Sequence, residues 1–229
     1  MVRTWESVVW ALVIAIAVVV GAVTARGAGS AAIVGLAPAA GSAASGGVRL
    51  NEILAGPARD WDGDGIYDAK SDEWVEIQNA GAAALPLDEL RLTDADRTVR
   101  FALSGTLAPG AVRLVLGSEA VAWQRSLGLS TSGLILNNSG DTVYLLRVAG
   151  VDTSVVDLHA YGSIEGASDR SVGRVSTGGE DWILFDALNR YTGSGTPAGT
   201  GCAPTPGGAN GCTTDVRETT WGAIKRLYR

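Results

Sequence analysis

The sequence has few of the residues on which most enzymes and zinc proteins depend. Its 229 residues include one histidine, His159, and two cysteines, Cys202 and Cys212. A zinc site draws on several cysteine or histidine ligands, so zinc chemistry has no ligand set here. With one histidine, and no serine or cysteine near it in an elbow motif, a nucleophilic triad cannot be recognised. No GxxxxGKS or GxxxxGKT occurs, which excludes a P-loop. We expect His159, within VVDLHAY, to be an ordinary packed or surface imidazole.

Basic residues are in the minority over the part of the chain that we expect to fold, residues 48–212. This part has 21 Asp and Glu against 12 Lys and Arg, a net charge of −9. Such a surface repels phosphate backbones, so we expect no nucleic-acid partner. It suits divalent cations and basic partners better.

One long hydrophobic run is present, at residues 8–23 (VVWALVIAIAVVVGAV). A spanning helix needs about 20 apolar residues and a signal-peptide core about 7–15, and this run falls between the two. Small residues at 23–25 suit a signal peptidase. We therefore interpret residues 1–25 as a hydrophobic helix that is either a cleaved signal peptide or a retained membrane anchor, with a soluble buried helix as the least favoured reading. Both leading alternatives export the domain, and the absence of a following cysteine excludes a lipoprotein.

The next segment, residues 26–47, is rich in Ala, Gly and Ser and predicts a flexible linker. Export also gives the two cysteines a role, because an oxidising compartment would pair Cys202 with Cys212. The Gly- and Pro-rich loop between them permits their approach, and the bridge would add about 2–3 kcal/mol. Two free thiols are the alternative, and a metal site is less favoured for lack of further ligands.

Residues 48–212 consist mainly of short runs in which apolar residues alternate with polar ones. Such alternation is typical of half-buried strands, and Gly- and Pro-containing turns separate the runs. One segment, 118–127, predicts a helix with Ala120, Trp123 and Leu127 on one face. The sequence therefore predicts an all-β fold, a β-sandwich. The expected strands are 48–54, 73–79, 89–93, 99–103, 111–117, 141–148 and 155–158.

An ordered set of motifs extends over this region: VRLNEIL, DEWVEIQNAG, FALSGTLAPGAVRLVL, GLILNNSGDTVYLL, VVDLHAYG and APTPGGANG. Their order and spacing resemble the lamin tail domain, in particular its bacterial exported members. The resemblance implies an immunoglobulin-like β-sandwich in which EWVEIQN is an early core strand, with Glu73 and Glu76 on its outer face. It also implies an adhesive or tethering module without catalytic residues.

Residues 60–77, DWDGDGIYDAKSDEWVEI, hold seven carboxylates. The part of this stretch that begins at Asp60 matches an EF-hand-type calcium loop. It has aspartates at loop positions 1, 3 and 5, glycine at 6, a backbone carbonyl at 7 and a carboxylate at 9. Ser71 stands at position 12, where the pattern has a glutamate, and Asp72 or Glu73 could close the shell instead. A solvated acidic turn and a catalytic cluster are the alternatives. The candidate calcium ligands are Asp60, Asp62, Asp64, Ile66, Asp68, Asp72 and Glu73.

The C-terminal residues 213–229 break the strand pattern. TTWGAIKRLYR predicts a short amphipathic helix capped by Thr220, with Trp221 and Ile224 on one face and Lys225, Arg226 and Arg229 opposite. This tail could lie against its own domain, dock on another protein or contact a membrane surface. Eleven residues are too few to be helical alone, so order here needs a partner surface.

The sequence as a whole predicts an exported, non-catalytic binding or tethering module of the cell envelope, stabilised by calcium and one disulfide. Its partner would be an envelope protein or polysaccharide, with membrane contact through residues 8–23 in the anchored case. A cell-envelope hydrolase that uses Glu73 and Glu76 is one alternative, and a purely structural surface protein is another. The hydrolase would need these two carboxyl groups to face each other, whereas strand positions 73 and 76 point to opposite faces.

Overall fold

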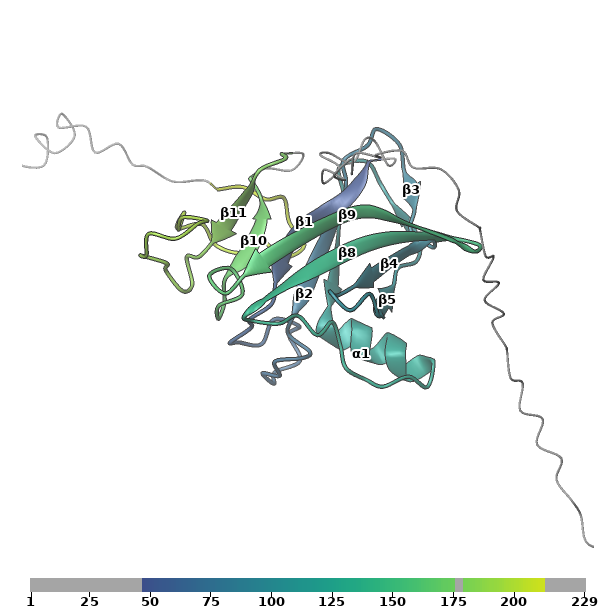
Figure 1. Cartoon of the computed structure of the whole chain (residues 1–229), viewed down its shortest axis with the longest axis horizontal. Coiled ribbons are helices and arrows are strands. Elements are labelled where there is room, and N and C mark those ends of the chain that lie inside the picture. Colours follow the sequence, from purple (N-terminus) through teal and green to yellow (C-terminus); the bar gives the residue numbers. More distant parts are fainter. Residues whose placement is uncertain (1–46, 176–178, 213–229) are drawn as a thin grey trace, which may run out of the picture. The chain divides into compact units, whose positions relative to one another are not determined.

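The computed structural model describes residues 47–175 and 179–212 (Figure 1). The expected N-terminal hydrophobic helix, the linker up to residue 46 and the C-terminal helix lie outside these residues. Within them, no helix is long and apolar enough to cross a membrane. The elements are β1 (Val48–Leu54), β2 (Trp74–Asn79), β3 (Leu85–Pro86), β4 (Leu90–Thr93), β5 (Val99–Ala102), β6 (Thr106–Leu107), β7 (Val112–Leu116), α1 (Gly117–Ser126), β8 (Gly140–Ala149), β9 (Asp152–Gly162), β10 (Ser171–Arg174) and β11 (Trp182–Phe185).

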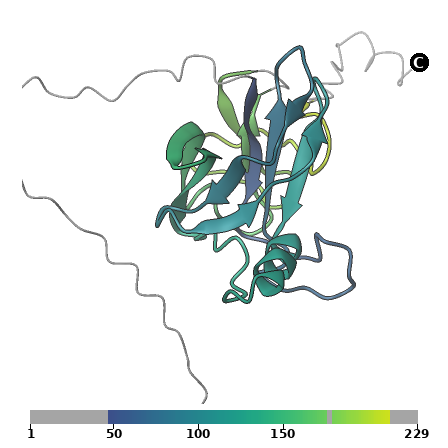
Figure 2. The same ribbon diagram turned by 90° about the vertical axis from the view of Figure 1, so that its right-hand side faces the viewer.

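Two antiparallel sheets make up the body of the domain (Figures 1 and 2). One has five strands in the order β11-β10-β1-β2-β7, and the other has four in the order β5-β4-β8-β9. A third, small sheet pairs β3 with β6. Apolar side chains of both large sheets form one buried cluster, for example Leu50 and Ile77 from the first and Leu92 and Leu145 from the second. The sheets therefore pack face to face, and the all-β prediction is confirmed.

A β-bulge at Asn51 sets which residues of β1 face the core. Leu50 pairs with Ile77 and Glu52 with Glu76, which leaves Asn51 as the extra residue. The bulge shifts the alternation by one position, so Val48, Leu50 and then Ile53 belong to the core cluster. The sequence left Ile53 and Leu54 as alternatives for the inward position. Both are buried, but the shift gives the core position to Ile53.

Strand β2 is buried on both faces, which corrects the expectation that Glu73 and Glu76 lie on an outer, exposed face. Glu76 is 0% exposed and Glu73 is 7% exposed. The physical reason is that later parts of the chain cover them. The backbone N–H of Gly207 donates to Glu76 Oε2, and that of Leu136 donates to Glu73 Oε2. Two different covering segments are involved, so the two glutamates occupy separate environments.

The segment that covers Glu76 is held by a buried polar network. Asn210 donates through Nδ2 to the backbone oxygens of Asn51 and Arg174, at 3.1 and 2.9 Å. The backbone N–H and the hydroxyl of Thr205 donate to Glu52, which is 0% exposed. Burial raises the pKa of Glu52, while these hydrogen bonds act in the opposite direction. Asn51, the bulge residue, also donates to Glu76.

The disulfide predicted for this segment is confirmed. Cys202 and Cys212 are bonded to each other, with their Cα atoms 5.3 Å apart, within the usual range for disulfides. The bridge closes a loop that contains Thr205, Gly207 and Asn210, the residues that dock on β1 and β2. A covalent link at the two ends of this loop limits the conformations open to it before it docks.

Helix α1 forms where the sequence predicts one, but its buried face differs from the prediction. Ala120 is buried and Trp123 packs against the core cluster, as expected. Leu127 is 57% exposed, and Gln124 takes the buried position instead. The amide of Gln124 binds backbone groups of Arg100 and Gly133, which a leucine could not do. A polar residue therefore takes a buried position of the helix, where the apolar periodicity predicts a leucine, because it pairs buried backbone groups.

Candidate functional site

The acidic loop, residues 60–72, connects β1 to β2 and lies beside α1 (Figure 2). Its far end fits tightly against the start of this helix, where a Cβ on Gly117 would lie 1.9 Å from the backbone oxygen of Lys70. The backbone N–H of Ser118 also donates to Ser71. Its near end is anchored by Trp61, whose ring lies edge-on against buried Trp74 at 6.0 Å. The loop is therefore fixed at both ends.

Backbone hydrogen bonds to its own carboxylates curl the loop. Asp60 accepts from the N–H groups of Gly63 and Gly65, at 2.6 and 2.8 Å. Both glycines have positive φ, 79° and 88°, a conformation that other residues rarely adopt. These hydrogen bonds, the one from Gly65 foremost, hold the pKa of Asp60 below its usual value. The aspartate–glycine spacing in the sequence thus produces the expected tight turn.

Asp72 is the centre of this arrangement. It is 0% exposed and accepts three backbone hydrogen bonds, from Trp61 (2.6 Å), Asp62 (3.1 Å) and Asp68 (2.8 Å). One ligand oxygen from each of Asp60, Asp62 and Asp72 lies within 4.8 Å of the others. Asp72 Oδ1 accepts two of these hydrogen bonds, whereas Asp72 Oδ2, both oxygens of Asp60 and Oδ1 of Asp62 accept one each and keep a second lone pair. The three residues can therefore face one cation without giving up their loop contacts.

Of the other predicted carboxylate ligands, Asp64, Asp68 and Glu73 do not belong to this trio. The backbone carbonyl of Ile66 stays a predicted ligand. Asp64 accepts from the N–H of Ile66, whose side chain is 67% exposed. Asp68 accepts from Lys70 and Ser71, and these bonds lower its pKa. Glu73 turns away to Leu136. Of the two residues that could close the shell, Asp72 and Glu73, the structure brings only Asp72 to Asp60 and Asp62.

Glu73 lies in a protein interior that favours its neutral form. Burial raises its pKa to about 8, with a smaller upward contribution from Asp141. Burial likewise raises the pKa of Glu76 to about 7, although Asn51 and Gly207 donate to it. The hydrolase alternative needs two carboxyl groups that face each other across a cleft. Glu73 and Glu76 share no such cleft, since each is covered by a different segment.

His159 is packed, as the sequence predicts. Its ring stacks on Trp182 at a centroid distance of 3.7 Å and an interplanar angle of 16°. Arg174 lies over the same indole at 5.0 Å, and Glu165 lies 3.9 Å from His159 Nε2. These contacts fix β9 to β10 and β11 and give the imidazole a structural role.

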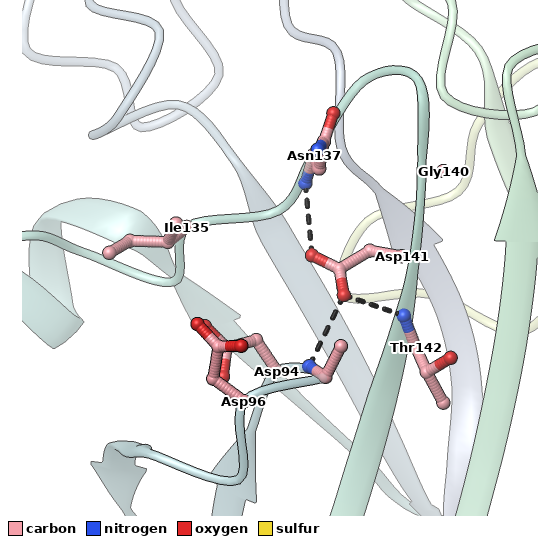
Figure 3. Close-up of a pocket in the computed structure, with 8 residues that line it drawn as sticks. Asp94, Asp96, Ile135, Asn137, Gly140, Asp141 and Thr142 are labelled. Atoms are coloured by element: carbon pink, nitrogen blue, oxygen red, sulfur yellow. Dashed lines mark hydrogen bonds between the residues drawn. The ribbon is translucent and has the colours of Figure 1, made fainter.

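A pocket that the sequence analysis did not identify lies where the β4–β5 turn meets the segment that enters β8 (Figure 3). Its volume is about 290 Å³. Three carboxylates contribute to its wall, Asp94 and Asp96 from the β4–β5 turn and Asp141 from more than 40 residues later in the sequence. The lining residues are Asp94, Ala95, Asp96, Ile135, Asn137, Gly140, Asp141 and Thr142.

Some predicted features lie outside the described residues. The hydrophobic run 8–23 is one, and the docking tail with Trp221, Ile224, Lys225, Arg226 and Arg229 is another. Both stay predictions from the sequence.

The comparison with family models agrees with the motif resemblance. Neither the curated proteins nor the solved structures gave a match to this chain. A family model, that of the Lamin Tail Domain, matches residues 41–163, which is more than half of the 229 residues. The match begins just before β1 and ends just after β9, so it includes the acidic loop, α1 and the strands of the four-stranded sheet. The chain therefore belongs to the lamin tail domain family.

Proposed function

We propose that this protein is an exported, non-catalytic binding or tethering module of the cell envelope, and that its acidic loop binds calcium. Family membership is the observation that carries the first part, because lamin tail domains are immunoglobulin-like binding modules. The disulfide between Cys202 and Cys212 supports export, since disulfides persist in oxidising compartments. The partner is an envelope protein or polysaccharide.

The tethering proposal is tested by where the chain resides. We expect cell fractionation after expression of the full chain to recover it in the envelope or the medium. We also expect non-reducing electrophoresis of that material to show the Cys202–Cys212 bridge, read as a mobility change on reduction. Recovery only in the cytosol, with free thiols, is incompatible with the proposal. A Cys202→Ser/Cys212→Ser variant is the control for the mobility change.

Calcium is proposed on the geometry of Asp60, Asp62 and Asp72. Calcium takes six to eight oxygen ligands at distances of about 2.3–2.6 Å, and it accepts carboxylates, backbone carbonyls and water. Three convergent carboxylates supply the charge, and carbonyls and water would complete the shell. Extracellular modules bind calcium with a Kd of about 10⁻⁴–10⁻³ M, so an incomplete protein shell is sufficient. The role would be structural, because the metal offsets repulsion between the carboxylates and holds the approach to β2.

Calcium titration of the purified full-length chain tests this proposal. At a calcium concentration about 100-fold above Kd, binding adds about 2.7 kcal/mol to the free energy of unfolding. For a chain of this size we expect Tm to rise by about 5–10 °C. The Asp60→Asn/Asp62→Asn variant removes two charges and keeps one oxygen acceptor at each position, so one of the two hydrogen bonds that Asp60 accepts is lost as well. It should lose most of the calcium-dependent rise in Tm.

The matched control is Glu89→Ala/Asp152→Ala, which removes two exposed carboxylates outside the loop. It should keep the full calcium-dependent rise in Tm. The same rise in the loop variant as in this control would rule out the loop as the calcium site.

A further inference from the structure

The pocket at the β4–β5 turn combines acidic and apolar groups in a small volume. Asp94 and Asp96 contribute from the turn, and Asp141 contributes from the start of β8 (Figure 3). Ile135 also belongs to the wall, with its side chain 41% exposed and its backbone at φ 54°, in the left-handed region. A β-branched residue rarely adopts this conformation. The volume of about 290 Å³ is close to the lower limit of about 300 Å³ for small-molecule sites.

Asp94 has an unsatisfied oxygen. The residue is 4% exposed, and its Oδ1 is buried without a hydrogen-bond partner in the described part of the chain. Its Oδ2 is fully used, because Arg100 donates to it through both Nε and Nη2. A buried carboxylate oxygen without a donor is costly and uncommon. An incoming N–H group would supply the missing donor.

Asp141 is held rigidly at the opposite wall. Its Oδ1 accepts from the N–H groups of Thr142 (2.7 Å) and Ala95 (3.2 Å), and its Oδ2 accepts from that of Asn137 (3.2 Å). These bonds join the two segments that form the pocket, as the dashed lines in Figure 3 show. Asp96, by contrast, is exposed and makes no hydrogen bond or ion pair among the described residues. Its carboxylate is therefore available to a ligand in the pocket.

The arginines of the same turn do not neutralise the pocket. Arg100 is engaged with Asp94 Oδ2, and its Nη1 donates to Ser132. Arg97 lies over the ring of Tyr144, 3.6 Å from its centroid. The three carboxylates of Asp94, Asp96 and Asp141 outnumber the one guanidinium paired with them, that of Arg100, so the pocket has a net negative charge. The domain as a whole, at −9 over residues 48–212, adds to the attraction for cations.

The spacing of the carboxylates favours an extended cation over a metal ion. Among the described residues, the cluster with ligand atoms close enough to share one metal ion is Asp60, Asp62 and Asp72. Asp94, Asp96 and Asp141 do not meet that condition. A guanidinium or ammonium group on an apolar stem presents several N–H donors over a wider span, and the stem can pack on Ile135.

We propose that this pocket binds the guanidinium or ammonium group of a basic side chain, with Asp94 and Asp96 as its anionic contacts and Ile135 against its stem. This inference rests on the proposed binding function and deepens it, because it names the chemistry of the group that the partner presents. Arginine suits the site better than lysine, since its planar fork of donors matches two carboxylates at once.

Methyl NMR of the full-length chain with labelled isoleucine methyl groups tests the proposal. Ile135 reports on the pocket, and Ile66 reports on the acidic loop, so one spectrum separates the two acidic sites. The probes are N-acetyl-arginine amide, N-acetyl-lysine amide and the neutral isostere N-acetyl-citrulline amide. We expect saturable shifts at Ile135 with the arginine probe, weaker binding of the lysine probe, and none with the citrulline probe.

Two variants and one control locate the charges. Asp96→Asn should weaken binding of the arginine probe about 2–5-fold, as for an exposed ion pair. Asp94→Asn should weaken it about tenfold or more, because that contact is buried. Asp152→Asn, an exposed carboxylate on β9, should leave the affinity unchanged. Asp96 has no structural partner, so its variant stays informative even if Asp94→Asn fails to fold.

Equal binding of the arginine and citrulline probes would overturn the proposal, as would an Asp96→Asn affinity equal to that of Asp152→Asn. Shifts confined to Ile66 would assign cation binding to the acidic loop and would also overturn it. These outcomes are separate from those of the proposed function, which localisation and calcium-dependent stability test.

Discussion

Asp72→Ala is expected to lower the free energy of unfolding by about 3–4 kcal/mol, measured in the presence of a calcium chelator. Asp72 is 0% exposed and accepts backbone hydrogen bonds from Trp61, Asp62 and Asp68. Charge-assisted bonds of this kind contribute about 1.5–3 kcal/mol each, but the three donors are only part-buried, so water replaces some of the lost interaction and the expected cost is below the sum. Chemical denaturation monitored by Trp fluorescence would measure the effect, since the ring of Trp61 contacts that of Trp74.

Asp62→Ala is the matched control for this prediction. Asp62 accepts a single bond, from the exposed N–H of Asp64 at 3.1 Å, so its loss should cost about 1 kcal/mol or less. Asp72→Asn keeps one oxygen acceptor and should fall between the two. If Asp72→Ala and Asp62→Ala destabilise the chain equally, the loop does not depend on its buried carboxylate.

The comparison of these two aspartates also shows what the sequence can predict about the loop. The alternation of Asp60, Asp62 and Asp64 before Gly65 predicts a curled turn, because each short acidic side chain binds a backbone N–H a few residues on. The sequence left Asp72 and Glu73 as alternatives for the last calcium ligand. Adjacent residues at the start of a strand point to opposite sides, so the choice depended on which side faces the loop.

Local pattern also predicted most of the strands, but it could not predict what covers them. The outer face of β2 carries Glu76, which in an alternating strand normally means solvent. Here Gly207, 131 residues later, donates to that carboxylate. Nothing in the neighbourhood of Glu76 encodes such a distant contact. The bulge at Asn51 could not be predicted either, because it arises from the pairing of β1 with β2 and not from the sequence of β1 alone.

The pocket was missed for the same reason. Asp94 and Asp96 look like ordinary turn residues in the sequence TDADRT, and Asp141 looks like the polar end of a turn before β8. Their proximity arises only when β4 pairs with β8, which brings Thr93 opposite Tyr144. Ala95 then donates to Asp141, 46 residues away. A buried carboxylate oxygen without a donor is a property of this assembled arrangement.

Glu73→Gln is expected to remove part of the loss of stability that the protein undergoes as pH rises. Folded Glu73 keeps its proton up to about pH 8, whereas an unfolded glutamate loses it near 4.5. Between these values the folded chain binds more protons than the unfolded chain, so stability falls with increasing pH. The loss at this residue between pH 5 and 8 is on the order of 3 kcal/mol, and Glu76, with a pKa of about 7, adds to it over the lower part of this interval.

The substitution is informative because glutamine keeps an oxygen that can accept from Leu136 but has no charge to bury. At pH 5 the variant and the natural chain should have similar Tm values. At pH 8 the variant should be more stable by roughly 5–10 °C, since 1 kcal/mol corresponds to about 2–4 °C at this size. Glu89→Gln, whose side chain is 60% exposed, is the control and should leave the difference between pH 5 and pH 8 unchanged.

The charges that face Glu73 decide how far this effect extends. Asp141 raises the pKa of Glu73 and Arg100 lowers it, both with less effect than burial. A basic group bound in the pocket beside Asp141 would therefore lower the pKa of Glu73 and reduce the loss of stability near pH 8. The carboxyl ¹³C shift of Glu73, followed from pH 4 to 9, should show a midpoint near 8 for the natural chain. A midpoint near 4.5 would contradict the buried, neutral state on which the prediction depends.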